Sequence, residues 1–107
     1  MINLTKKPFY LSGEDIKWVE NTKKNMTTEE KIGQLFVPIG YSGDPGYLEH
    51  VMLSHHIGGI MYRCGDAEEM QSTHRYLQEH SKIPLLIGAN LEDGGCGIAV
   101  DGTQYGK

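Results

Sequence analysis

The sequence predicts an α/β protein in which short parallel strands alternate with helices. Three observations predict it: apolar runs of strand length, helix-capping residues ahead of the amphipathic segments between them, and glycines where the runs end. Runs that are apolar throughout are typical of parallel strands covered on both faces of their sheet. The expected order is a leading helix followed by β, α, β, α and β.

The leading helix is expected within SGEDIKWVENTKKN, residues 12–25. Ser12 is placed to cap it, and Glu14 and Asp15 fall in its first turn, where carboxylates interact favourably with the helix dipole. Its apolar stripe is expected to consist of Ile16, Val19 and Trp18.

A second short helix and the first strand are expected in MTTEEKIGQLFVPIG. Thr27 and Glu30 have the spacing of a capping box, which predicts a helix start. The run LFVPIG, residues 35–40, is the candidate strand, and Gly40 closes it. The apolar residues that lead into this strand are Ile32, Leu35 and Phe36.

A further helix and the second strand follow. Asp44 is the expected cap and Pro45 the first helical residue, a position at which proline is favoured. This helix is expected to continue through GYLEHVMLSHH, and the run from Gly59 to Tyr62 is the second strand. One side of the helix is expected to carry Leu48, Val51 and Met52.

The last helix is expected in DAEEMQSTHRYLQEHS, where Asp66 and Glu69 repeat the capping spacing. Its buried face is predicted as Met70, Leu77 and either Thr73 or His74. The third strand is IPLLIGAN, residues 83–90. Right-handed crossovers would place the three strands side by side, either in a doubly wound sheet or in the opening arc of a (β/α)₈ barrel.

Composition narrows the class of protein. The chain has 107 residues, which predicts one domain at most, and its net charge of −4 with no basic patch gives no reason to expect nucleic acid or an anionic membrane as partner. The amino terminus lacks the apolar segment of a signal peptide, and no apolar run approaches the roughly 20 residues that span a bilayer. We therefore expect a cytoplasmic protein whose two thiols, Cys64 and Cys96, are reduced.

Polar residues gather where the strands end. Asn90, Glu92 and Asp93 follow the third strand, and Arg63 follows the second. In either parallel fold the carboxyl ends of the strands form the edge at which ligands bind, so these four are the candidate ligand-binding residues. The nearby glycines, which permit sharp turns or close approach to a ligand, are Gly94, Gly95 and Gly97.

Ordinary structural roles compete with these assignments. Glu92 and Asp93 could form a solvated turn, and Arg63 could pair with Asp66 or Glu92. Because Glu92 and Asp93 are adjacent in sequence, they are not expected to act as a pair of catalytic carboxylates on opposite sides of a scissile bond, which requires a separation of at least about 5 Å. Cys96 lacks a legible partner base, and no metal site is expected. The histidines are expected on helix surfaces or at a helix end: His50, His55, His56, His74 and His80.

The segments MTTEEKIGQLFVPIG, HIGGIMYR, KIPLLIGANLEDGG and DGTQYG resemble, in this order, the amino-terminal end of glycoside hydrolase family 3. The likeness is strongest to its β-N-acetylhexosaminidase branch and covers the chain from Thr27 to Gly106. It implies a (β/α)₈ TIM-type barrel and hydrolysis of terminal β-linked N-acetylglucosamine with retention of configuration. Members form a glycosyl-enzyme on an aspartate, with a histidine backed by an aspartate as acid/base. No metal or organic cofactor is implied.

The sequence departs from the family pattern in two respects. A (β/α)₈ barrel needs about 250 residues, so we expect residues 1–107 to be an amino-terminal fragment, with 1–26 a leading segment and 27–107 the first β/α units. The family's catalytic segments have no counterpart, and no catalytic residue is assigned. After the third strand, LEDGG stands where many members have aspartate, glutamine, glutamate and two glycines. Aligning the glycines puts Asp93 at the family's glutamate and Leu91 at its sugar-binding aspartate. Aligning the strand instead puts Asn90 at that aspartate with one inserted residue, and strand phase favours this second alignment.

Two alternatives stay open. The chain could be a non-catalytic, partial-barrel folding unit that self-associates, because three parallel strands with apolar faces and exposed edges invite a second copy. The specificity could also be that of a β-glucosidase in the same family, since none of these residues indicates binding of the acetamido group of N-acetylglucosamine.

Overall fold

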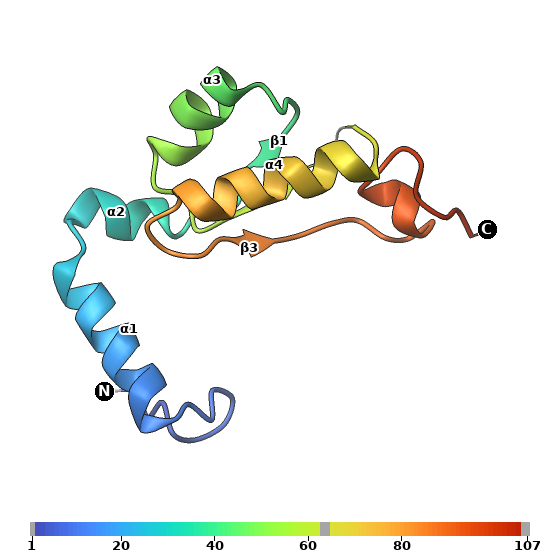
Figure 1. The fold of residues 1–107 in the computed structure, drawn as a ribbon. Helices are drawn as coiled ribbons and strands as arrows, with labels where there is room; N and C mark the ends of the chain where they lie inside the picture. Colours follow the sequence, from blue (N-terminus) through green and yellow to red (C-terminus); the bar gives the residue numbers. More distant parts are fainter. Residues whose placement is uncertain (1, 63–64, 106–107) are drawn as a thin grey trace.

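The computed structural model describes residues 2–62 and 65–105, and Figure 1 shows its arrangement. Its elements, in chain order, are α1 (Gly13–Asn25), α2 (Thr28–Gly33), β1 (Ile39–Gly40), α3 (Pro45–Tyr47), the π-helix η1 (Leu48–Leu53), β2 (Gly59–Tyr62), α4 (Ala67–His80), β3 (Leu86–Ile87) and the 3₁₀ helix η2 (Gly95–Gly97). The predicted order of helices and strands is therefore confirmed.

The three strands form a parallel sheet in the order β1-β2-β3. Ile39 lies opposite Met61 in one pair, and Gly59 lies opposite Leu86 in the other. The central strand has the predicted bounds, Gly59–Tyr62, whereas the outer strands are shorter than the predicted runs 35–40 and 83–90.

Proline accounts for part of this shortening. Pro38 and Pro84 carry no N–H, so neither residue can donate a hydrogen bond to a ladder within its run. The flanking chain still pairs with β2, but irregularly: Met61 N–H donates to the Pro38 carbonyl at 2.9 Å, and Gly88 N–H donates to the Ile60 carbonyl at 2.9 Å. The apolar runs therefore extend further than the regular strands.

One face of the sheet packs on helices. The side chains of Ile60 and Tyr62 are fully buried, and Leu48 from η1 and Leu77 from α4 join them in the core. Helix α4 buries Met70, Thr73 and Leu77, so the predicted face is confirmed with Thr73 rather than His74 at its centre. The side chains of Val51 and Met52, predicted for the same core, lie outside the described residues.

The opposite face of the sheet is uncovered, which corrects the expectation of helices on both sides. Leu86 is 72% exposed and Ile39 is 38% exposed, although the apolar sequences of their strands predicted that both would be buried. In a (β/α) barrel the helices pack outside the strands and the inner face meets the other strands of the barrel. The described residues supply three strands, so their sheet forms only part of a barrel.

The helix caps follow the sequence closely. The Ser12 hydroxyl accepts from Asp15 N–H and the Thr27 hydroxyl accepts from Glu30 N–H, each as half of a reciprocal capping box. The carboxylates of Asp44 and Asp66 also cap their helices, each accepting a hydrogen bond from the N–H three residues later. The helix after Asp44 differs from expectation: one α turn passes into the π-helix η1 instead of a regular helix to His56.

Helix α1 contradicts its predicted burial. It contains no buried residue, and Trp18 is 54% exposed. In Figure 1 it points away from the sheet and the other helices, consistent with principal extents of 45 × 33 × 19 Å. Its stripe residues Ile16 and Val19 are half-buried, and Ile16 lines a hollow with Ile2 and Leu4 of the preceding segment. The helix thus packs on its own leader and not on the core.

Candidate functional site

The predicted binding residues follow β3 at the carboxyl edge of the sheet. Asn90 and Glu92 are exposed, and Asp93 is half-buried. Because β2 and β3 run parallel, the segment after β3 leaves the sheet at the same edge as the segment that begins at Gly65 (Figure 1). Arg63, predicted for this edge, lies outside the described residues.

The backbone of this loop is tightly organised. Gly94 N–H donates to the Leu91 carbonyl at 3.0 Å, and Tyr105 N–H donates to the Asp93 carbonyl at 2.8 Å. The Cys96 thiol lies 3.5 Å from the same Asp93 carbonyl, a structural contact. Gly94 has φ 101°, a conformation that a side chain strongly disfavours, so this glycine is required by the turn.

The carboxyl-terminal segment ties the exits of β2 and β3 together. Asp101 accepts a hydrogen bond from Ala67 N–H at 2.7 Å, which places a carboxylate at the start of α4. Val100 N–H donates to the Gly65 carbonyl at 3.0 Å, and Ala99 is buried in the core. The loop after β3 therefore folds back over the end of β2.

The acids of this loop keep their acceptor capacity. Within residues 2–62 and 65–105, no hydrogen bond or ion pair engages the side chains of Asn90, Glu92 or Asp93. An amide that can both donate and accept, next to two carboxylate acceptors, suits the hydroxyl groups of a neutral polyol. That these three side chains contact a ligand remains a prediction.

A second polar group behind this edge was missed by sequence reasoning. It comprises Tyr62, Glu69, Thr73 and His74, and we refer to it as the His74 cluster. The Tyr62 hydroxyl donates to Glu69 Oε1 at 3.5 Å, and the His74 ring meets Tyr62 edge-on with centroids 5.9 Å apart. A Cβ at Gly43 would lie 3.0 Å from both Glu69 Oε1 and the Tyr62 hydroxyl, so the loop after β1 covers the cluster.

His74 is half-buried, which corrects its assignment as a helix-surface residue, whereas His50 and His80 are exposed as predicted. Its Nε2 is buried without a hydrogen-bond partner among the described residues. Burial lowers the pKa of His74 below its usual 6.5. The only sequence signal for this site was the unresolved choice between Thr73 and His74 on the α4 face.

Acidification is expected to destabilise the fold through His74. The unfolded chain takes up a proton on this residue near its ordinary pKa, while the folded chain resists it, so the stabilising contribution is complete above about pH 6.5 and declines as pH falls from there towards the lowered folded pKa. Thermal denaturation at pH 7.5 and pH 5.5 measures the loss. The variant His74→Gln, which cannot titrate, should show a smaller loss; an equal loss would contradict this role.

The other candidate groups do not form sites. His55 and His56 are exposed at the end of the η1 segment. Across the described ranges, no three His, Cys, Asp or Glu side chains come together as a metal-binding group. Within the same ranges, no helix combines the length and apolar character needed to cross a membrane.

The amino edge of the sheet holds two hollows. Residues that directly precede β2 and β3, including His56 and Lys82, line a cavity of about 530 Å³. A second cavity of about 510 Å³ is lined by α2 and the segment before β2. Sequence reasoning proposed no site here, because glycines and acids drew attention only to the carboxyl edge.

The chain is similar to enzymes that act on β-glycosides. No protein-family model matches it. Over all 107 residues it is 42% identical to a protein named beta-N-acetylglucosaminidase/beta-glucosidase from Cellulomonas fimi, and it spans 19% of that protein's length. Two solved structures of the beta-glucoside phosphorylase BglX, one of them bound to 2FGlc, match 86% of the chain. The structure bound to 2FGlc matches with a TM-score of 0.74 and 44% identity, and the match covers 16% of that BglX chain. The other matches with a TM-score of 0.68 and 39% identity, and the match covers 15% of that chain.

These likenesses agree with the order of the sequence motifs and with the three-stranded parallel sheet. The whole 107-residue chain is similar to members of glycoside hydrolase family 3, consistent with an amino-terminal fragment of a protein of that family.

Proposed function

We propose that this chain supplies part of the sugar-binding edge of a retaining exo-glycosidase that hydrolyses terminal β-linked N-acetylglucosamine. The observation that carries the proposal is the position of Asn90, Glu92 and Asp93 at the carboxyl edge of a parallel sheet, with side chains that no described residue engages. The identity of 42% to a beta-N-acetylglucosaminidase/beta-glucosidase supports the substrate class.

In this proposal the chain binds and does not cleave. The Asn90 amide and the Asp93 carboxylate hydrogen-bond the hydroxyl groups of the terminal sugar, and Glu92 completes the rim. Neighbouring carboxylates cannot act as nucleophile and acid/base on opposite sides of one glycosidic bond, because that chemistry requires a separation of about 5 Å or more. The groups that break the bond therefore belong to other segments of the active protein.

The purified chain is accordingly expected to show no turnover of nitrophenyl β-N-acetylglucosaminide. Turnover that co-purifies with the chain and is abolished by Glu92→Gln or Asp93→Asn would contradict the division between binding and cleavage.

A second candidate is phosphorolysis of a β-glucoside. The similarity to the beta-glucoside phosphorylase BglX, with a TM-score of 0.74, favours it. Both reactions act at a β-glycosidic bond and differ in the attacking group, water in one and phosphate in the other. Titrating the chain with N-acetylglucosamine and with glucose separates the specificities: tighter binding of glucose favours a β-glucoside enzyme, whether β-glucosidase or phosphorylase.

Asn90→Ala is expected to weaken sugar binding by roughly 2- to 10-fold, because one hydrogen bond contributes about 0.5–1.5 kcal/mol. Backbone amide shifts in an NMR titration with N-acetylglucosamine measure the dissociation constant. Asn21→Ala is the matched control, since Asn21 is an exposed asparagine on α1, away from this edge. Unchanged affinity of Asn90→Ala, or shifts confined to another surface, would contradict the proposed contact.

A further inference from the structure

Asn90 and Asp93, at the proposed sugar-binding edge, are held through their backbone carbonyls. The Asp93 carbonyl accepts a hydrogen bond from Tyr105 N–H at 2.8 Å. The Asn90 carbonyl packs against Gly97, where a Cβ would lie 1.6 Å from its oxygen. Both contacts are made by residues 94–105, which we call the closing loop. The position of the two binding residues therefore depends on where the closing loop lies.

The closing loop is compact within itself. Gly94 and Gln104 form an antiparallel bridge, so the two ends of the loop lie together. Between them Gly102 packs against Gly95, since a Cβ on Gly102 would lie 2.2 Å from the Gly95 carbonyl carbon. Close packing of this kind transmits a displacement from one part of the loop to the next. The attachment of the loop to the rest of the protein then decides where its inner end meets Asn90.

The closing loop is attached to the first turn of α4. Ala67 N–H donates to Asp101 Oδ1 at 2.7 Å, and Val100 N–H donates to the Gly65 carbonyl at 3.0 Å. Figure 1 shows the carboxyl-terminal segment lying beside the start of α4. These bonds join the segment that follows β3 to the segment that follows β2.

Asp101 completes a helix cap that the residues next to α4 leave unfinished. The first N–H groups of a helix have no partner within the helix. The Asp66 carboxylate accepts from Glu69 N–H at 2.9 Å, and Asp101 accepts from Ala67 N–H. A carboxylate in this position makes a charge-assisted hydrogen bond and interacts favourably with the helix dipole. Because α4 buries one face in the core, its first turn is a fixed point for the loop.

We propose that Asp101 is a positioning residue: its hydrogen bond to Ala67 N–H holds the closing loop, and thereby Asn90 and Asp93, in place at the carboxyl edge. The consequence for sugar affinity rests on the proposed function of that edge. Asp101 acts through the loop and not by contact with the sugar. Its bond joins residues 34 positions apart, so losing it releases the loop while the packing of α4 on the sheet persists.

Removing the carboxylate tests this role in the full 107-residue chain. In Asp101→Ala, the Ala67 amide should lose protection from hydrogen exchange, and the backbone amides of residues 88–97 should shift in NMR spectra recorded without sugar. The amides of Ile60 and Leu77 in the core should not move. Binding of N-acetylglucosamine should weaken about 2- to 10-fold, the range of a single hydrogen bond. Asp101→Asn keeps an acceptor oxygen for the same bond and should restore both the shifts and the affinity.

The donor of the bond offers an orthogonal variant. Ala67 is the first residue of α4, where proline is favoured, and Asp66 before it has φ −77° and ψ 179°, an extended conformation that suits a residue preceding proline. Ala67→Pro deletes the N–H and should reproduce the changes of Asp101→Ala. Because both variants break one bond, the double variant should bind sugar no more weakly than the weaker single variant. If Asp101→Ala fails to fold, Ala67→Pro and Asp101→Asn still decide the question.

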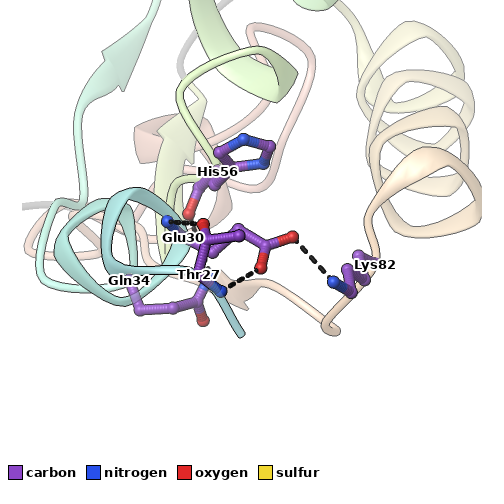
Figure 2. A network of polar contacts seen from close by, with 5 residues as sticks. All are labelled: Thr27, Glu30, Gln34, His56 and Lys82. Carbon is purple, nitrogen blue, oxygen red and sulfur yellow. Dashed lines mark hydrogen bonds and ion pairs between the residues drawn. The ribbon is translucent and has the colours of Figure 1, made fainter. Parts of the chain in front are cut away.

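An ion pair of the same length at the amino edge is the matched control. Lys82 Nζ donates to Glu30 Oε1 at 2.7 Å, which joins the segment before β3 to α2 (Figure 2). The two residues lie 52 positions apart. Lys82→Ala breaks this long-range contact and should leave the amides of residues 88–97 and the affinity for N-acetylglucosamine unchanged.

The outcomes distinguish this inference from the proposed function. Unmoved amides of residues 90–97 in Asp101→Ala would overturn the positioning role, whether or not the chain binds sugar. Failure of Asp101→Asn to restore those amides would overturn it too, because the effect would then belong to the charge. Equal sugar affinity of Asp101→Ala and the unmodified chain would overturn it and leave the proposed function standing. Displaced amides in Asp101→Ala, with no sugar binding by the unmodified chain, would support the positioning role and contradict the proposed function.

Discussion

Replacing Leu77 by alanine is expected to cost about 2–5 kcal/mol of unfolding free energy. Leu77 is completely buried on α4, where it packs with Ile60, Tyr62 and Leu48 in the core. The substitution removes apolar contacts and leaves a cavity that the surrounding helices and strands fill only in part. Total stability of a small domain is about 5–15 kcal/mol, so the variant loses a large share of it. Urea denaturation followed by circular dichroism measures the change.

The matched control is the same substitution on the other side of the sheet. Leu86 is 72% exposed, so Leu86→Ala should alter the unfolding free energy little, within about 0.5 kcal/mol. The comparison tests the assignment of the two sheet faces. Equal losses at both positions would mean that the open face is covered in solution, and that the one-sided core described above is wrong.

Replacing Gly97 by alanine is expected to disrupt the loop that follows β3. A Cβ at this position would lie 1.6 Å from the Asn90 carbonyl oxygen, far closer than any tolerated contact. The cost is steric and cannot be relieved by a side-chain rotation, because the obstructing atom belongs to the backbone. We expect a destabilisation of about 1–3 kcal/mol or more and a displaced Asn90. Denaturation gives the first quantity, and the amide shifts of residues 88–97 reveal the second.

Gly13→Ala serves as the control for this experiment. No atom lies within 4 Å of a Cβ built on Gly13, and the residue is the first of α1. Alanine is a better helix former than glycine, so this variant should be neutral or slightly stabilising. If Gly97→Ala kept both the loop resonances and the stability of the unmodified chain, the close packing of residues 90–97 would be refuted.

Local signals in the sequence predicted local structure well. Thr27 and Glu30 carry a reciprocal capping pattern, and the helix starts where this pattern places it. Asp66 caps α4, and the apolar run between two glycine-rich turns gives β2 its bounds. These features depend on residues within a few positions of one another, so no knowledge of the tertiary fold is needed to identify them.

The predictions that were wrong concern burial, which depends on the surface that packs against each residue. Leu86 and Trp18 have the patterns of buried residues, yet each is largely exposed, because a hydrophobic pattern does not specify the surface that covers it. His74 illustrates the reverse case. Its burial depends on Tyr62, twelve positions earlier, and on the loop that carries Gly43. Only the packing of α4 against β2 brings those groups together.

The sequence predicted at which edge of the sheet the candidate site lies, but it did not predict which groups contact one another there. Parallel strands necessarily bring their carboxyl ends to one edge, so Asn90 and Arg63 were expected to share that edge. The link made by Asp101 to Ala67 N–H was not expected, since it joins residues 34 positions apart in a glycine-rich segment. Such a contact depends on loop conformation, which periodicity does not encode.

The lack of any buried residue in α1 has a consequence for how this protein can evolve. Substitutions in that helix leave the core untouched, so its sequence can drift, or be grafted from a homologue, without endangering the fold of the remainder. The exposed positions of residues 13–25 are therefore free to diversify, while Ile60, Tyr62 and Leu77 stay constrained by folding.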